Sequence, residues 1–174
     1  MRDLIQNDIE VSYSFEIQDS RDLFLEFLRR YDEYQNDVMS SGNAVVCAIL
    51  AWHVVDWIYE EFPSVTGSFK KKSDFQKALK AKCLSLEYIQ DIANGTKHKG
   101  IDMYKPTVKN TDAKEGSFSE FFSGFSHESF DKSGLRMTLD DGSEVYFDEE
   151  IFNIKEFLHN YFTNTLGVNI QQRK

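Results

Sequence analysis

A histidine and an aspartate stand three residues apart in the most apolar stretch of the sequence, residues 44–59. His53 and Asp56 therefore share a face if this stretch is helical. A carboxylate beside an imidazole can fix the tautomer of the ring and raise its pKa, which is what a general base needs. A polar pair satisfied inside a helical core, or at a dimer seam, has the same pattern. Both interpretations stay open, and both residues are candidate catalytic residues.

A second polar cluster lies at the end of a later amphipathic segment, and its members are Asp91, Asn94, Lys97 and His98. Their spacings of three, four and seven place them on one side of a helix. Asn, Lys and His together can bind a phosphate, position a ribose hydroxyl and transfer a proton. The alternative is a helix C-terminus decorated with cations that suit its dipole, closed by a nearby glycine.

The charge of the chain is unevenly distributed. The net charge is −9, yet residues 69–114 contain eleven Lys and five acidic residues, a net charge of +6. The remainder carries nine basic and 24 acidic residues, a net charge of −15. This balance argues against unspecific coating of nucleic acid but allows one local phosphate site. The candidate phosphate- or RNA-binding residues are Lys70, Lys71, Lys72, Lys97 and Lys99.

No spacing of His, Cys, Asp or Glu typical of a metal site is present, so neither a metal nor a cofactor is expected. Cys47 and Cys83 lie on apolar faces and are predicted to be core thiols. Two cysteines cannot form a disulfide framework, which favours reduced thiols in a cytoplasmic protein. The N-terminal residues lack the apolar core of a signal peptide, and the 16-residue apolar run is shorter than the ~20 residues that span a bilayer. We therefore expect no membrane partner.

The elements that must position these residues follow from hydrophobic periodicity. Alternation over residues 9–17 predicts a strand that could pair with a later hairpin. Helices are predicted over residues 21–38, capped by Asp19 or Ser20, over 44–61, over a third-to-fourth segment from about 73 to 96 that breaks or kinks near Lys82, and over 148–166, closed by Gly167.

Residues 99–130 show no regular pattern, although several Phe residues within them could be buried. An Asp-Gly turn between two alternating runs then predicts a β-hairpin over about 135–147. The predicted fold class is mainly α, a four- or five-helix bundle with a small antiparallel β-hairpin or sheet. We expect a single domain over residues 1–174, with a helical core over 20–100 and a hairpin-plus-helix addition over 133–167.

The central helix with His53 and Asp56, followed by a helix that ends in Asn94, Lys97 and His98, resembles bacterial and phage proteins with HEPN-like bundles. The resemblance covers about residues 20–100. It implies a dimer and, for many members, a metal-independent ribonuclease of toxin or phage-defence systems. His98 matches the motif histidine and Asn94 the polar residue before it, while the motif arginine is replaced by Ala93. Lys97 offers a point charge in place of the bidentate fork of an arginine.

Two functions follow as hypotheses. In the first, a HEPN-like homodimer binds or cleaves RNA or a nucleotide, with His98 as acid/base, Asn94 and Lys97 on phosphate or ribose, and His53 and Asp56 in support. In the second, the chain is a non-catalytic dimeric scaffold, antitoxin-like module or adaptor for a protein partner, which Ala93 and the acidic bulk favour. A small-molecule hydrolase that uses His53, Asp56 and His98 with a metal is a third and weaker hypothesis.

Overall fold

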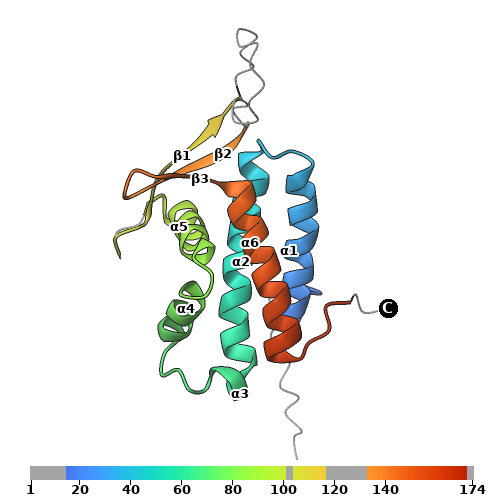
Figure 1. Ribbon diagram of the computed structural model, residues 1–174. Helices are drawn as coiled ribbons and strands as arrows, with labels where there is room; N and C mark the ends of the chain where they lie inside the picture. The colour runs from blue at the N-terminus through green and yellow to red at the C-terminus, as the bar shows by residue number, and fades with distance from the viewer. Residues whose placement is uncertain (1–14, 101–103, 117–132, 172–174) are drawn as a thin grey trace, which may run out of the picture.

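Four long helices form the body of the molecule (Figure 1). The computed structural model describes residues 15–100, 104–116 and 133–171. The long helices are α1 (Ser20–Gln35), α2 (Ser41–Glu61), α5 (Ser85–His98) and α6 (Phe147–Asn160); the shorter ones are α3 (Pro63–Thr66) and α4 (Lys72–Lys80). A three-stranded antiparallel sheet packs at one end of the bundle. The predicted fold class, mainly α with a small antiparallel sheet, is confirmed.

The starts of the first two helices are fixed by local capping. The carboxylate of Asp19 accepts a hydrogen bond from the backbone N–H of Asp22 at 2.8 Å, as predicted for the N-cap of α1. The hydroxyl of Ser40 accepts one from the N–H of Asn43 at 3.3 Å and begins α2. Helix α1 ends at Gln35, earlier than the predicted residue 38, because a turn from Tyr34 to Ser40 redirects the chain.

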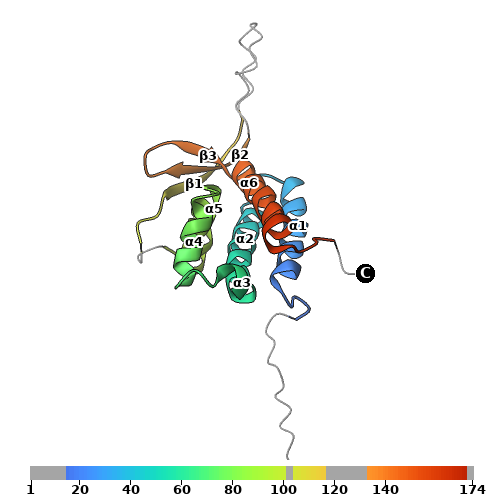
Figure 2. The same cartoon turned by 60° about the horizontal axis from the view of Figure 1, so that its bottom comes forward.

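Helix α2 is the central helix of the bundle. Helices α4 and α5 lie on one side of it and α1 and α6 on the other (Figures 1 and 2). It has 21 residues, five more than the apolar run at residues 44–59, and it is the one helix of the described residues long and apolar enough to cross a membrane, with 44% of that window buried. Its buried residues, Ala44, Cys47, Ala48, Ala51, Trp52, Val54, Val55 and Ile58, fall on one broad side of the helix, and Val46 and His53 on the other side are exposed.

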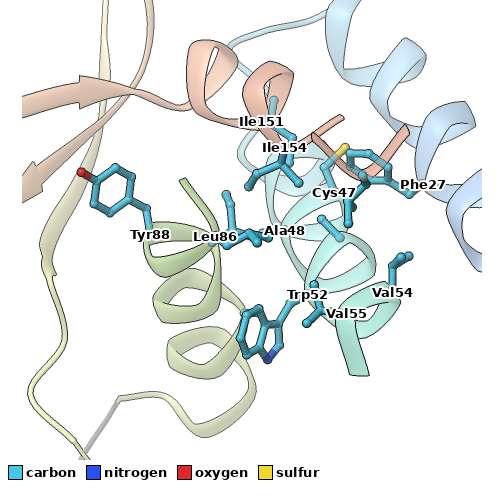
Figure 3. Close-up of a cluster of buried hydrophobic side chains, with 14 of the residues drawn as sticks. Phe27, Cys47, Ala48, Trp52, Val54, Val55, Leu86, Tyr88, Ile151 and Ile154 are labelled. Atoms are coloured by element: carbon cyan, nitrogen blue, oxygen red, sulfur yellow. The ribbon is translucent and has the colours of Figure 1, made fainter. Parts of the chain in front are cut away.

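The bundle core forms where α2 meets helices from both sides. Figure 3 shows Leu86 of α5 and Ile151 and Ile154 of α6 gathered around the small residue Ala48 of α2. All four side chains are fully buried. Burying an Ile or Leu side chain contributes roughly 1.5–3 kcal/mol, so this meeting point stabilises the placement of α5 and α6 against α2. Residues 133–167, set apart in the sequence, thus supply part of the same core.

The segment after α2 bends twice before α5 begins. Pro63 occupies the first turn of α3, where its missing N–H costs nothing, and α2 ends just before it at Glu61, as predicted. The predicted break near Lys82 is confirmed, since α4 ends at Lys80 and α5 starts at Ser85. Helices α4 and α5 therefore form a separate layer beside α2 (Figure 2).

The sheet contains one strand that the sequence pattern did not predict. The hairpin of β2 (Gly134–Leu139) and β3 (Glu144–Tyr146) is confirmed, with Gly142 at a positive φ of 86° in its turn. Strand β1 (Val108–Lys114) lies within the stretch predicted to be irregular and pairs with β2. Its residues are mostly exposed, so no burial alternation marks it, and cross-strand pairing defines it instead.

Two further expectations differ from the structure. The described end of the predicted strand over 9–17, residues 15–17, forms a turn and no strand, and residues 9–14 lie outside the described residues. The last helix starts at Phe147 and changes after Asn160 into a π-helical turn, η1 (Tyr161–Leu166). Gly167 closes it in the left-handed conformation, as predicted.

Candidate functional site

The last turn of α5 presents three consecutive basic residues to solvent. Lys97 and His98 are exposed, and Lys99 ends the helix in the left-handed conformation with a φ of 57°. The N–H of Gly100 then bonds the carbonyl of Gly95 at 3.1 Å, which satisfies one of the terminal acceptors of the helix. The predicted closure by a glycine is therefore made through Lys99 and Gly100 together. Among the described residues, the side chains of Lys97, His98 and Lys99 have no hydrogen-bond or ion-pair partner.

Asp91, about two turns before His98 on α5, connects this helix to the segment that follows it. It is 4% exposed, and its Oδ2 accepts hydrogen bonds from the backbone N–H groups of Thr107 at 2.7 Å and Val108 at 2.9 Å. Its Oδ1 accepts a third from the hydroxyl of Tyr104 at 2.8 Å. A buried carboxylate with three donors is well satisfied. Asp91 thus attaches the start of β1 to α5.

Asn94 belongs to the same connection. Its amide Nδ2 donates to the hydroxyl oxygen of Tyr104 at 3.2 Å, so Tyr104 bridges Asn94 and Asp91. Burial, together with the hydrogen bond to Asp91, raises the pKa of the Tyr104 hydroxyl to about 12. One turn before Asp91, the carboxylate of Glu87 accepts a hydrogen bond from the hydroxyl of Thr107 at 3.3 Å. One of the two N–H groups of the Asn94 amide is therefore engaged with Tyr104, in a hydrogen bond exposed to solvent.

His53 and Asp56 lie on another part of the molecule. His53 is exposed, and Asp56 accepts a hydrogen bond from Nε2 of Gln76 on α4 at 2.6 Å. Val45 of α2 lines the same cavity as Thr96 and Gly100, which lie at the end of α5. The position of Val45 along α2 is therefore beside the end of α5. At 1.5 Å per helical residue, His53 and Asp56 lie about 12 and 16 Å further along α2. The structure does not bring them together with His98.

The lysines at the start of α4 have different environments. Lys70 and Lys71 are exposed, whereas Nζ of Lys72 lies 2.9 Å from Oε1 of Glu60. The hydrogen bond to Glu60 raises the pKa of Lys72. Residues 70–72 lie at the start of α4 and residues 97–99 at the end of α5, so the two groups stand at opposite ends of the α4–α5 layer (Figure 1).

Cations without a partner are confined to one segment of the described chain. Seven lysine side chains make no described hydrogen bond or ion pair: Lys70, Lys71, Lys77, Lys82, Lys97, Lys99 and Lys109. We refer to these seven residues as the basic face. Every described Arg or Lys outside residues 70–109 has an interaction partner. Arg29, for example, contacts Glu26 and Glu33, both at 2.6 Å.

A groove runs beside the end of α5. A cavity of about 400 Å³ is lined by Val45, Asp91, Ile92, Gly95, Thr96, Gly100, Pro106, Val108, Lys109, Asn110 and Thr111. A second cavity of about 210 Å³ shares Val45, Ile92 and Thr111 with it and continues toward Phe147. We call the two cavities together the β1–α5 groove. Residues 97–99 lie between two of its lining residues, Thr96 and Gly100, and so flank one end of it.

Sequence reasoning missed Tyr104, Thr107 and Lys109 as parts of this region. All three come from the stretch without a regular pattern, and only its length and lysine content could have pointed to them. The position of the motif arginine, Ala93, is buried in the core. Across the described ranges, no group of three His, Cys, Asp or Glu side chains is placed to hold a metal ion. Cys47 is buried, which raises its pKa to about 12, and Cys83 is half-buried.

Comparisons of this chain with protein-family models, with curated proteins and with solved structures found no match. Its function therefore has to be argued from its own residues.

Proposed function

We propose that this protein is a HEPN-like RNA-binding protein that contacts RNA phosphates through its basic face. The observation that carries the proposal is the confinement of unpartnered lysines to residues 70–109, in a chain whose other described cations are all engaged. A lysine paired with a carboxylate has little charge to offer a ligand. An unpaired one can replace the counterions of a phosphate chain.

The arrangement of the basic face suits an elongated anion. Its lysines extend from the start of α4, past the end of α5, to Lys109 on β1, and α4 and α5 form a single layer on one side of α2. Lysine is a compact point charge that does not need the planar geometry of a bidentate contact. We therefore expect binding driven by charge, with little discrimination among RNA sequences.

The surroundings of the motif residues favour binding over cleavage. His98 has no carboxylate or other described partner that would orient its ring, and the amide of Asn94 already donates to Tyr104. Ala93 is buried where the resembling family carries its phosphate-binding arginine. His53 and Asp56 lie on α2, away from His98 at the end of α5. Within the part of the chain that the structure describes, these residues do not assemble a cleaving site.

The test is RNA binding at several salt concentrations, measured by fluorescence anisotropy with a labelled single-stranded oligonucleotide. The double variant Lys97→Gln/Lys99→Gln is compared with Arg21→Gln/Arg29→Gln, which removes the same charge from cations engaged on α1. If both lysines bind phosphates of a single strand, their removal should lower the salt slope by about 1.4. The α1 variant should keep the wild-type slope. Equal salt slopes for all three proteins, or no RNA binding at about 50 mM salt, would refute the proposal.

We also propose a cytoplasmic location and a homodimeric state. Two free cysteines, with no disulfide in the described chain, suit a reducing compartment. Sedimentation of the purified protein tests the dimer, and a single monomeric species at micromolar concentration would exclude it.

A non-catalytic adaptor is the second candidate function. The β1–α5 groove favours it, because a groove of this size beside an exposed strand edge suits a protein ligand rather than a phosphate chain.

A further inference from the structure

Strand β1 leaves one edge of the sheet without a partner strand. The strand order is β1-β2-β3, so β1 is an outer strand of the described sheet. At its start, this edge is held by α5, because the N–H of Val108 donates to Asp91. Beyond that point, the backbone of residues 109–113 makes no described hydrogen bond outside the sheet. Unpaired N–H and C=O groups of an edge strand are a template for a further strand.

Of the described residues, none covers the outer part of the side of β1 that faces the bundle. Thr111 and Ala113 are opposite Met137 and Leu135 of β2, so all four side chains lie on the same side of the sheet. Met137 is 1% exposed, whereas Thr111 and Ala113 are exposed and line the groove. The side chains of the bundle therefore bury β2 but do not extend to the outer edge of β1.

The groove is bounded by this strand edge and by a helix. Ile92 and Thr96 of α5 form the opposite wall, and Val45 of α2 contributes to both cavities. A groove between the edge of a strand and a helix accommodates a peptide in extended conformation, whose backbone pairs with the strand while alternate side chains enter the groove. At about 3.3 Å per residue, the seven residues of β1 extend over about 23 Å.

The two ends of the groove differ in charge. Lys109 lines one end, and Lys97 and Lys99 flank it. The other end is mostly apolar, with Ala44, Leu135 and Phe147. The carboxylates of the lining already have partners within the protein, since Asp112 forms an ion pair with Arg136 at 2.7 Å and Asp91 accepts three hydrogen bonds. An occupant with carboxylates at one end and apolar side chains at the other complements this arrangement.

A nucleic acid fits the groove less well than a peptide does. Unpaired bases are usually bound by stacking on aromatic rings, and the larger cavity has no aromatic residue in its lining. A base would also leave the backbone groups of residues 109–113 without partners.

We propose that the β1–α5 groove is a docking site for an extended peptide segment of a protein partner, with apolar residues at alternate positions and acidic residues at one end. The peptide adds to the outer edge of β1 as a fourth strand. Its apolar side chains contact Val45 and Ile92, and its carboxylates lie near Lys109, Lys97 and Lys99. This inference rests on the adaptor function and not on RNA binding, although Lys97, Lys99 and Lys109 of the basic face serve both ligands.

The experiment starts with selection of a random-peptide display library on the immobilised full-length protein. The enriched peptides are synthesised, labelled and titrated against variants at two adjacent positions of α2. Val45 lines both cavities, whereas Val46 is 39% exposed and lines neither. Val45→Lys should weaken binding by about tenfold or more, and Val46→Lys should leave it within about twofold of the wild type. Circular dichroism and thermal melting confirm that both variants are folded.

The selected sequences and hydrogen exchange provide the remaining readouts. We expect alternating apolar residues with acidic residues at one end, and slower amide exchange at residues 109–113 when the peptide is bound. The absence of enrichment, or equal binding to wild type and Val45→Lys, would overturn the proposal. If Val45→Lys weakens RNA binding instead, the groove holds a nucleotide. If it dissociates a homodimer, the occupant is a second copy of this chain; either result rejects a partner peptide.

Discussion

The hydroxyl of Tyr104 donates a hydrogen bond of 2.8 Å to the buried carboxylate of Asp91 and also accepts one of 3.2 Å from Asn94. Two residues that the helical spacing grouped as candidates for chemistry are thus joined by a residue from outside the helix. The joint fixes the end of α5 against the segment that leads into β1. It therefore determines where Lys97 to Lys99 and the β1–α5 groove lie relative to each other.

The first prediction concerns Asp91. Asp91→Ala should lower the free energy of unfolding by about 2–4 kcal/mol, because two backbone N–H groups and the Tyr104 hydroxyl lose their acceptor. Urea unfolding followed by circular dichroism measures the loss. Asp32→Ala, at an exposed position of α1, is the control and should change stability by less than about 0.5 kcal/mol. Equal effects of the two changes would mean that the joint contributes nothing.

The second prediction concerns alkaline pH. The pKa of Tyr104 is raised from 10.0 to about 12 in the folded protein, so the folded state holds its proton where the unfolded chain releases it. This contribution to stability is complete below pH 10 and is lost as the pH rises toward 12. Tyr104→Phe should therefore show a shallower loss of stability over this range, measured by urea unfolding at several pH values. Buried tyrosines such as Tyr34, whose pKa is also raised, are present in both proteins and contribute equally to the pH dependence of both. Parallel curves would contradict the assignment.

The third prediction compares two glycines that each have free space for a Cβ atom. Gly42 lies in the first turn of α2 and Gly167 at a φ of +67°, and neither would place a Cβ within 4 Å of another group. Gly42→Ala should stabilise the protein by about 0.5 kcal/mol, because alanine loses less backbone entropy in a helix. Gly167→Ala should destabilise it by about 1 kcal/mol through left-handed strain. Thermal denaturation of both variants tests the opposite signs.

The fourth prediction concerns catalysis at His98. We expect the wild type to bind RNA without cleaving it from about pH 5 to about pH 9, because Ala93 has no group to hold a phosphate beside the imidazole and none of the described residues orients the ring of His98. Gel analysis of labelled RNA after prolonged incubation is the measurement. Cleavage by the wild type that is lost in His98→Ala, with RNA binding retained, would show that the protein is a ribonuclease and reject this expectation.

The sequence by itself determined the local elements and the distribution of charge. Periodicity located the helices, the Asp-Gly turn located the hairpin, and Asp19, Pro63 and Gly167 fixed helix ends through contacts within a few residues. The lysine-rich segment was also visible, since charge can be counted without a fold. These features depend on interactions short in sequence, which a one-dimensional pattern records.

Only the tertiary structure decided which candidate residues meet. Asp91 and Asn94 share a helix face with His98, but their partner Tyr104 comes from a stretch without a pattern. His53 and Asp56 were expected to support His98, but the packing of α2 on α5 separates them from it along the helix axis. Strand β1 was invisible because an exposed edge strand needs no alternating hydrophobic residues. Side-chain convergence and strand pairing join positions distant in sequence, and their distances are set by how the helices pack.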